Sequence, residues 1–176
     1  MSEHNKNTIN MYNTGGALEY IQNNKANPET EKWERLLSYI ESQLHSDKSK
    51  KIIEFGSGAG ELAILLQTAG YNIIATDIVD DFLAEQNRIG INNVLRYNFL
   101  SDDFNSTFDF KADLIVSWRN PHLDMEDMKR LFEVAYNGLT DNGLLIINFQ
   151  NAEVHPNANI LRNGTKYEYK ILEDKK

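Results

Sequence analysis

The stretch KIIEFGSGAGEL, residues 51–62, places three glycines between an apolar run and the start of an expected helix. Gly56 permits a tight turn out of the strand, and Gly58 leaves room for a ligand that lies across the loop. Gly60 lets the next helix start close to the sheet. Because a helix N-terminus offers unpaired N–H groups to an anion, we expect this loop to bind a nucleotide-like ligand with a negative group.

The spacing of the glycines narrows the choice of ligand. The dinucleotide fingerprint is G-x-G-x-x-G, whereas this loop reads G-x-G-x-G, one residue shorter. No Lys-Ser or Lys-Thr pair follows, so the phosphate-binding loop of nucleotide hydrolases is not matched. The short loop leaves less room for a pyrophosphate. With Glu54 two positions ahead of Gly56, it suits a zwitterionic amino-acid group. The alternative is that the glycines only shape a strand–helix turn.

The rest of the chain alternates between apolar runs and amphipathic stretches. Strands are predicted for residues 51–55, 72–77, 93–98, 112–118 and 143–149, and helices for residues 27–47, 61–70, 80–90 and 125–139. In the first of these helices Asn27 and Pro28 form a typical cap and first-turn pair. The alternation predicts an α/β fold with a doubly wound, mostly parallel sheet and helices on both faces.

Composition sets limits on the function. The chain has 176 residues, a formal net charge of −8 and no cysteine. One soluble domain is the natural expectation for this length. The negative charge makes nucleic acid an unlikely partner, and the missing cysteines exclude disulfides and thiolate chemistry. No apolar run approaches a membrane span, and the start is polar, so a cytoplasmic protein without a membrane partner is expected. The four histidines are too scattered to predict a metal site.

A second acidic residue closes the second predicted strand. Asp77 lies twenty-one positions after Gly56. In a βαβ unit this position places a carboxylate beside a nucleotide ribose, where its oxygens accept from both hydroxyls. Ile78 follows, well placed to pack on an adenine. The alternative makes Asp77 the cap of the next helix, although Asp80 and Asp81 suit that position better.

Taken in order, these motifs resemble the class I S-adenosylmethionine-dependent methyltransferases. The resemblance runs from about residue 51 to residue 151 and rests on IIEFGSGAGEL, IIATDIV, ADLIVSWRNPHLD and GLTDNGLLII. It implies S-adenosylmethionine as the cofactor and a Rossmann-like fold. The implied arrangement is a helical lid segment at residues 1–46, a cofactor-binding core at 47–151 and a short C-terminal edge segment at 152–176. The implied cofactor-binding residues are Glu54, Gly56, Ser57, Gly58, Gly60, Asp77, Ile78, Asn98, Phe99 and Ser117.

Within this set, Asn98 stands where the family often has an aspartate that accepts from the adenine amino group. An amide oxygen can accept the same bond. Asp102 or Asp103 would take that role if the register differs.

The acceptor side is predicted at residues 117–124, SWRNPHLD, which leave the carboxyl end of a central strand. Trp118 could wall the methyl-transfer pocket, and Arg119 could pair with an acidic substrate. His122 is the candidate general base, with a structural role as its alternative. Tyr20 is a candidate substrate contact from the N-terminal lid. Asp124 is expected to cap the following helix.

The predicted function is methyl transfer to a small-molecule acceptor. One alternative is a non-catalytic S-adenosylmethionine-binding module or partner subunit, because only 25 residues follow residue 151 and the expected sheet is shortened at its C-terminal edge. An amino-methylating enzyme on protein or nucleic acid is a weaker alternative, suggested by NPH at residues 120–122. A nicotinamide oxidoreductase is disfavoured by the loop spacing. An exposed sheet edge also suggests a homodimer, since bare edges tend to find partners.

Overall fold

The computed structural model describes residues 3–26, 28–118 and 123–148. Its centre is a sheet of five parallel strands in the order β3-β2-β1-β4-β5. The order reverses between β1 and β4, so a crevice is expected at the carboxyl ends of these strands. The strands are β1 Lys51–Phe55, β2 Asn72–Asp77, β3 Val94–Arg96, β4 Ala112–Ser117 and β5 Leu139–Ile147.

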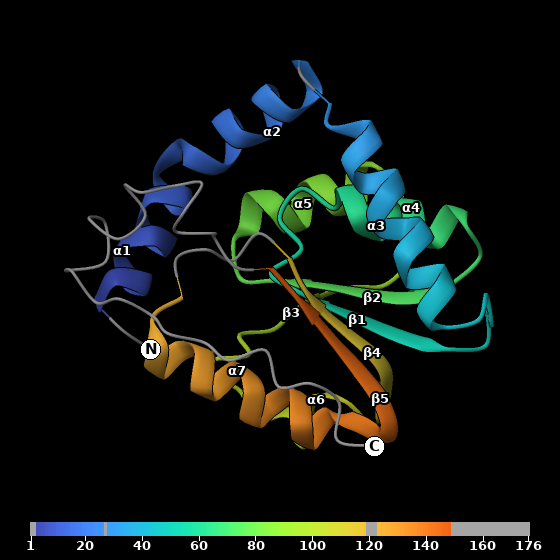
Figure 1. Cartoon of the computed structure of the whole chain (residues 1–176). Coiled ribbons are helices and arrows are strands. Elements are labelled where there is room, and N and C mark those ends of the chain that lie inside the picture. The colour runs from blue at the N-terminus through green and yellow to red at the C-terminus, as the bar shows by residue number, and fades with distance from the viewer. Residues whose placement is uncertain (1–2, 27, 119–122, 149–176) are drawn as a thin grey trace, which may run out of the picture.

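Helices cover both faces of this sheet, as the sequence predicts (Figure 1). One face carries α3 Thr30–Gln43, α4 Glu61–Thr68 and α5 Asp80–Arg88, and the other carries α6 Phe104–Thr107 and α7 Met125–Gly138. Strand β1 shows why both faces are covered, because Ile52 and Ile53 point to opposite sides and each is fully buried. The prediction of a doubly wound α/β fold is confirmed.

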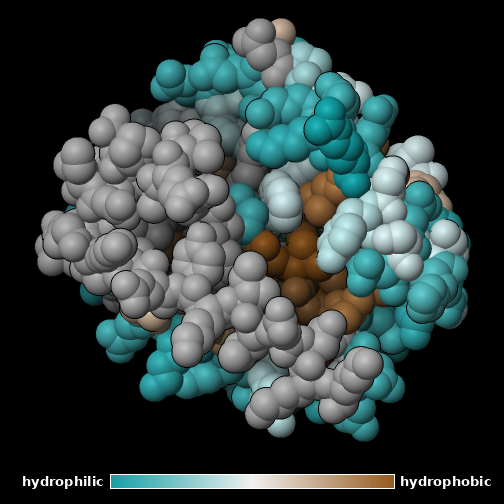
Figure 2. All heavy atoms as spheres, viewed as in Figure 1, coloured by the Kyte–Doolittle hydropathy of each residue, from teal (hydrophilic) through white to brown (hydrophobic). Residues whose placement is uncertain are grey.

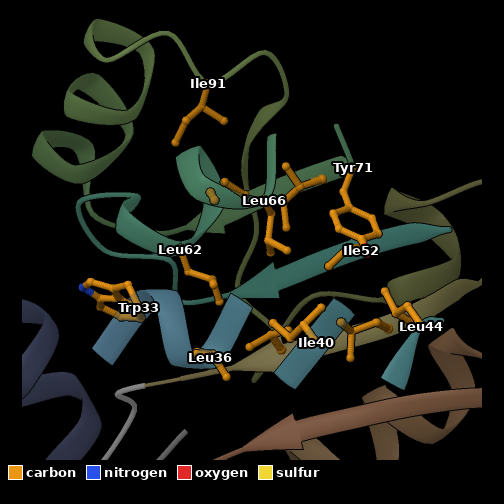
Figure 3. Close-up of a cluster of buried hydrophobic side chains, with 14 residues drawn as sticks. Trp33, Leu36, Ile40, Leu44, Ile52, Leu62, Leu66, Tyr71 and Ile91 are labelled. Carbon is orange, nitrogen blue, oxygen red and sulfur yellow. The ribbon is translucent and has the colours of Figure 1, made fainter. Parts of the chain in front are cut away.

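The larger core lies between β1 and the helices α3 and α4. The apolar side chains Trp33, Leu36, Ile40 and Leu44, which recur at helical spacing, are buried there, and Leu37 packs against them partly buried. Figure 3 shows these side chains facing Leu62 and Leu66 of α4 and Ile52 of β1. Burying an apolar side chain of this size contributes roughly 1.5–3 kcal/mol, so this stripe is what holds α3 on the sheet.

Several element boundaries differ from the sequence prediction, and two of the differences are informative. Helix α3 begins at Thr30 with Glu29 at its N-cap, later than the Asn27–Pro28 pair suggests, and Asn27 lies outside the described residues. Strand β5 already begins at Leu139, which pairs with Ala112, and the register then jumps so that Leu144 pairs with Leu114. The intervening residues, expected as a turn, therefore bulge out of the strand.

The cap of α7 is as predicted. The Asp124 side chain accepts hydrogen bonds from the N–H groups of Glu126 and Asp127. This cap fixes the start of α7 directly after the segment that leaves β4.

Three helical segments precede α3. Helices α1 Glu3–Met11 and α2 Ala17–Ala26 are joined through η1 Tyr12–Gly16, where Gly15 has a φ of 111° and breaks the helical path. Ala17 and Ile21 of α2 pack against Phe82 of α5. In Figure 1 these segments, in blue, arch beside the carboxyl ends of the strands. The expected role of this segment as a lid stays a prediction.

Within the described ranges, β5 is an edge strand with no neighbour on its outer side. A groove between α3 and β5 is floored by apolar side chains, including Leu36, Leu145 and Ile146. Figure 2 shows brown atoms in this hollow, next to the polar residues of α3. The C-terminal edge segment expected at residues 152–176 lies outside the described residues, and a homodimer through this edge stays a prediction. No helix in the described part of the chain is long and apolar enough to cross a membrane.

Candidate functional site

A cavity of about 600 Å³ opens at the carboxyl ends of the central strands. Its volume lies within the usual range for sites that enclose small molecules. The sheet side is formed by the glycine loop, the end of β2 and the segment after β3, while the lid side is formed by η1, α2 and the start of α3. The cavity therefore lies at the strand-order reversal, where open α/β sheets bind ligands.

The glycine loop is held in place by hydrogen bonds to β2 and to α5. Both the N–H and the hydroxyl of Ser57 donate to the carbonyl of Thr76. The Gln86 amide nitrogen donates to the Ser57 hydroxyl at 2.9 Å and to the Gly58 carbonyl at 2.7 Å. Because Gln86 is fully buried on α5, it fixes the loop against that helix.

We expect Gln86→Leu to lower the free energy of unfolding by about 1–3 kcal/mol, because it leaves the Gly58 carbonyl without its donor. Urea denaturation measures this change. Gln43→Leu, at an exposed position on α3, makes the same change of side chain outside the loop. If both variants lose the same stability, Gln86 does not brace the loop.

Asp77 is almost fully buried, and its carboxylate accepts three backbone hydrogen bonds. One oxygen accepts from Gly58 at 2.8 Å, and the other accepts from Ile78 at 2.7 Å and Val79 at 3.0 Å. Burial raises the pKa of Asp77, while these three hydrogen bonds oppose the rise. Asp77 is not the N-cap of α5, because Val79 occupies that position. Its carboxylate instead joins the glycine loop to the end of β2 and still faces the cavity.

Glu54 is the most deeply buried acid of the cavity. Its side chain is 3% exposed, and its Oε2 atom has no hydrogen-bond partner within the described residues. Burial raises the pKa of Glu54 well above its usual range, and the nearby carboxylates of Glu61 and Asp77 add to the rise. A buried acid without a partner is costly, so this atom needs a donor or a cation from a ligand.

The adenine side of the predicted site is also present. Ile78, Asn98 and Phe99 all line the cavity. The Asn98 side-chain oxygen accepts from Leu100 N–H at 3.0 Å and keeps a second lone pair for another donor. Asp102 turns away to accept from the Asn98 N–H, and neither it nor Asp103 belongs to the described cavity wall.

An aromatic cluster closes the lid side. Tyr12 and Tyr20 pack against Phe82 of α5, with ring centroids 5.3 and 5.6 Å from it. A Cβ on Gly58 would meet only Tyr20, at 3.9 Å, so the space above the loop extends to the tyrosine ring. The predicted substrate contact Tyr20 therefore does line the cavity.

An ion-paired group fixes α2 to α5 next to this cluster. Glu85 binds Arg88 of its own helix and Lys25 of α2, the latter at 2.9 Å. The Arg88 hydrogen bonds, aided by Lys25, lower the pKa of Glu85 to about 2. The negative charge of Glu85 is thus retained far into the acid range.

This pairing predicts a pH dependence. The folded pKa of Glu85 lies near 2 and its ordinary value is 4.5. The stabilisation is therefore fully present above about pH 4.5 and is lost as the pH falls towards 2. In chemical denaturation between these pH values, we expect Glu85→Gln to reduce the fall in the free energy of unfolding. Glu34→Gln, on the exposed face of α3, should retain the parent slope. If the free energy of unfolding falls equally with pH in the parent and in both variants, the ion pairs of Glu85 do not cause the pH dependence.

The structure separates the predicted site residues into three groups. The cavity wall contains Glu54, Gly56, Ser57, Gly58, Asp77, Ile78, Asn98, Phe99, Trp118 and Tyr20. Gly60 and Ser117 are near it but outside the wall, Gly60 as the N-cap of α4 and Ser117 buried at the end of β4. Arg119 and His122 lie outside the described residues, so their roles stay predictions. The described residues contain no group of side chains suited to a metal ion.

Sequence reasoning missed several residues of this site. Asn24, Trp33 and Glu61 all line the cavity, and the Asn24 side chain donates to the Glu61 carboxylate. Gln86 was also missed, although a signal exists, because it stands four residues after Phe82 and so on the same helix face as that aromatic side chain. No local pattern marks Asn24 and Glu61, which meet only after folding.

Comparison with known proteins agrees with this geometry. The family model described as "Methyltransferase domain" matches residues 52–143, more than half of the chain. The chain belongs to this methyltransferase domain family. It is also 27% identical over 106 residues to an uncharacterized methyltransferase of Staphylococcus carnosus (strain TM300). That match covers 60% of this chain and 50% of the relative, so the chain spans about half the length of the curated relative that it matches.

Solved structures share the fold at low sequence identity. The DhpI–SAM–HEP complex has a TM-score of 0.64 at 16% identity, covering 96% of this chain and 75% of the other. Magnesium protoporphyrin IX methyltransferase from Synechocystis PCC 6803, with bound SAM, has a TM-score of 0.61 at 12% identity. The match covers 79% of this chain and 73% of the other. Together with the family match, they confirm the resemblance to class I enzymes and S-adenosylmethionine as the cofactor of the domain.

The cavity has the features that this cofactor requires. The unpartnered Glu54 oxygen can receive the ammonium of the methionine end, and the open space above Gly58 admits a ligand across the loop. Asp77 faces the cavity, and its three backbone donors leave about one of its four acceptor sites for a ribose hydroxyl. The residues present therefore fit S-adenosylmethionine.

Proposed function

We propose that this chain transfers a methyl group from S-adenosylmethionine to a small-molecule acceptor. The observation that carries the proposal is a cavity that combines the glycine loop and Asp77 with an aromatic wall from the N-terminal segment. Such a wall leaves room for a small acceptor next to the cofactor and restricts access by a folded macromolecule. The acidic wall also disfavours a nucleic-acid acceptor.

The cofactor, when bound, supplies an electrophilic methyl group on a sulfonium. The role proposed for the protein is to position the cofactor and the acceptor and to exclude water. Asp77 accepts from the ribose hydroxyls, and Glu54 faces the ammonium. Asn98 and Ile78 hold the adenine. Tyr20 and Trp118 line the space in which the acceptor nucleophile would align with the methyl carbon. His122 remains the proposed base if the acceptor must lose a proton.

A methyl-transfer assay tests this function. The chain is incubated with S-adenosylmethionine labelled in its methyl group and with a small-molecule extract, and label is then sought in the products. We expect the label to appear in small molecules. When the concentration of S-adenosylmethionine is limiting, the Asp77→Ala variant should transfer less label than the parent. Label only in protein or nucleic acid would contradict the acceptor class. Cofactor binding without any labelled product would favour the non-catalytic binding module.

A further inference from the structure

The groove between α3 and β5 has no part in the proposed cofactor site. Its volume is about 620 Å³, close to the 600 Å³ of the cofactor cavity, and both lie in the usual range for small-molecule sites. The molecule therefore offers a second space of the size that a small ligand needs. The apolar residues that line this groove are Leu36, Tyr39, Trp118, Leu145, Ile146 and Ile147.

Trp118 connects the groove with the cavity, because it lines both. Strand order explains this position. Strand β4 lies between β1 and β5, and Trp118 directly follows Ser117, the last residue of β4. Asp77 and Asn98, the proposed ribose and adenine contacts, follow from β2 and β3 on the other side of β1. The β5 side of the site is therefore left for the methyl acceptor.

Helix α3 also runs past both spaces. Glu29 and Trp33, at its start, line the cavity, whereas Lys32 and Leu36 line the groove. Each of the two groove residues stands three positions after a cavity residue, which is close to one helical turn. The groove thus continues from the cavity along α3, and a molecule lying in it can reach the cofactor side past Trp118.

The charges around the groove are balanced. Its charged residues are Glu31, Lys32 and Arg35, all on α3. Arg35 pairs with Glu31 one turn away, and Lys32 lies 3.7 Å from Glu29. Neither sign is left in excess beside the apolar floor, so the groove suits an uncharged ligand that buries apolar surface.

Trp118 also carries an unsatisfied hydrogen-bond donor. Its ring packs partly buried against the α3 side of the core, and its Nε1 atom is closed to water. Within the described residues this N–H has no hydrogen-bond partner. An indole N–H can only donate, and a buried donor without an acceptor is destabilising. A ligand that lies between the groove and the cavity can supply the missing acceptor atom.

We propose that the groove between α3 and β5 binds the apolar body of an uncharged methyl acceptor, and that the Trp118 N–H donates to a carbonyl or hydroxyl oxygen of that molecule. This inference rests on the proposed methyltransferase function for the word acceptor. Binding in the groove is a separate property and can be measured without any turnover.

Two uncharged fluorescent dyes, Nile red and pyrene, test this site. Both are apolar, but Nile red has a carbonyl oxygen, whereas pyrene has no strong hydrogen-bond acceptor. We expect both to bind the full chain, with or without saturating S-adenosylhomocysteine. Trp118→Phe should weaken the binding of Nile red roughly 2- to 12-fold more than that of pyrene, which is the range for one neutral hydrogen bond.

A matched pair of tyrosines tests the position of the dyes. Tyr39 lines the groove and is 53% exposed, whereas Tyr136 is 83% exposed on α7, on the other face of the sheet. Tyr39→Ala should weaken the binding of both dyes, because it removes apolar wall, and Tyr136→Ala should leave both affinities unchanged. Urea denaturation establishes that each variant folds.

Three outcomes would overturn the proposal. Equal weakening of both dyes by Trp118→Phe would remove the role of its N–H. Displacement of Nile red by S-adenosylhomocysteine would place the dye in the cofactor cavity. Failure of both dyes to bind the full chain would give the groove another occupant, and sedimentation velocity shows whether that is a second copy.

Titration with S-adenosylhomocysteine alone separates this proposal from the function on which it rests. Cofactor binding without dye binding sinks only the acceptor site, whereas dye binding without cofactor binding sinks the methyltransferase function. A labelling experiment with methyl-labelled S-adenosylmethionine then tests the acceptor class. Label in uncharged apolar compounds that carry an oxygen supports the proposal, and label confined to charged compounds contradicts it.

Discussion

Asp77→Ala is expected to weaken binding of S-adenosylhomocysteine by about 1.5–3 kcal/mol, roughly 10- to 150-fold, the range for hydrogen bonds to a charged group. The substitution has two effects. It removes the proposed ribose acceptor, and it leaves the N–H groups of Gly58, Ile78 and Val79 without the carboxylate that orders them. Both effects act on the bound cofactor, because Gly58 itself lines the cavity.

The loss of affinity is measured by titration calorimetry, with urea denaturation run in parallel to establish that the variant folds. Asp77→Asn serves as the matched control, because it keeps one acceptor oxygen and the shape of the side chain. We expect an intermediate affinity for it. If Asp77→Ala folds normally and binds as tightly as the parent, the assignment of Asp77 to the cofactor is wrong.

Gly60→Ala is expected to have the largest effect on stability, a loss of about 2–5 kcal/mol in the free energy of unfolding. Gly60 has a φ of 90°, a conformation that costs a residue with a Cβ about 1–2 kcal/mol. A Cβ there would also lie 2.6 Å from Ile91 Cδ1 and 3.1 Å from Gln86 Cγ. Overpacking of this kind adds roughly 1–3 kcal/mol and displaces the residue that braces the glycine loop.

Gly70→Ala separates the two causes. Gly70 has nearly the same φ, 92°, but no atom lies within 4 Å of the position that its Cβ would take. We therefore expect Gly70→Ala to show only the backbone cost of about 1–2 kcal/mol. Equal losses for the two variants would mean that close packing of α4, Ile91 and Gln86 is not what requires glycine at position 60.

Most of the fold could be predicted because its signals are local. Strand β1 and the stripe on α3 each carry the period of their own secondary structure, and burial of both faces follows from continuous apolar runs. The boundaries were less predictable. Leu139 joins the sheet by pairing with Ala112, a contact between strands that the apparent turn in residues 139–143 conceals.

The cofactor half of the site was equally readable from sequence, since the glycine loop and Asp77 have fixed spacings within one βαβ unit. The lid half was not. Asn24 and Glu61 are 37 positions apart, and Lys25 reaches Glu85 on another helix. Such pairs depend on how α2 docks against α4 and α5, and that docking is set by packing of Ile21 and Phe82 rather than by any motif.

The central claim is that this cavity holds S-adenosylmethionine, and calorimetric titration of the chain with S-adenosylhomocysteine tests it most directly. The account predicts saturable binding at one site per chain, weakened in Asp77→Ala, and no binding of NAD under the same conditions. Absence of heat from both S-adenosylhomocysteine and S-adenosylmethionine at high protein concentration, with binding of NAD instead, would contradict it.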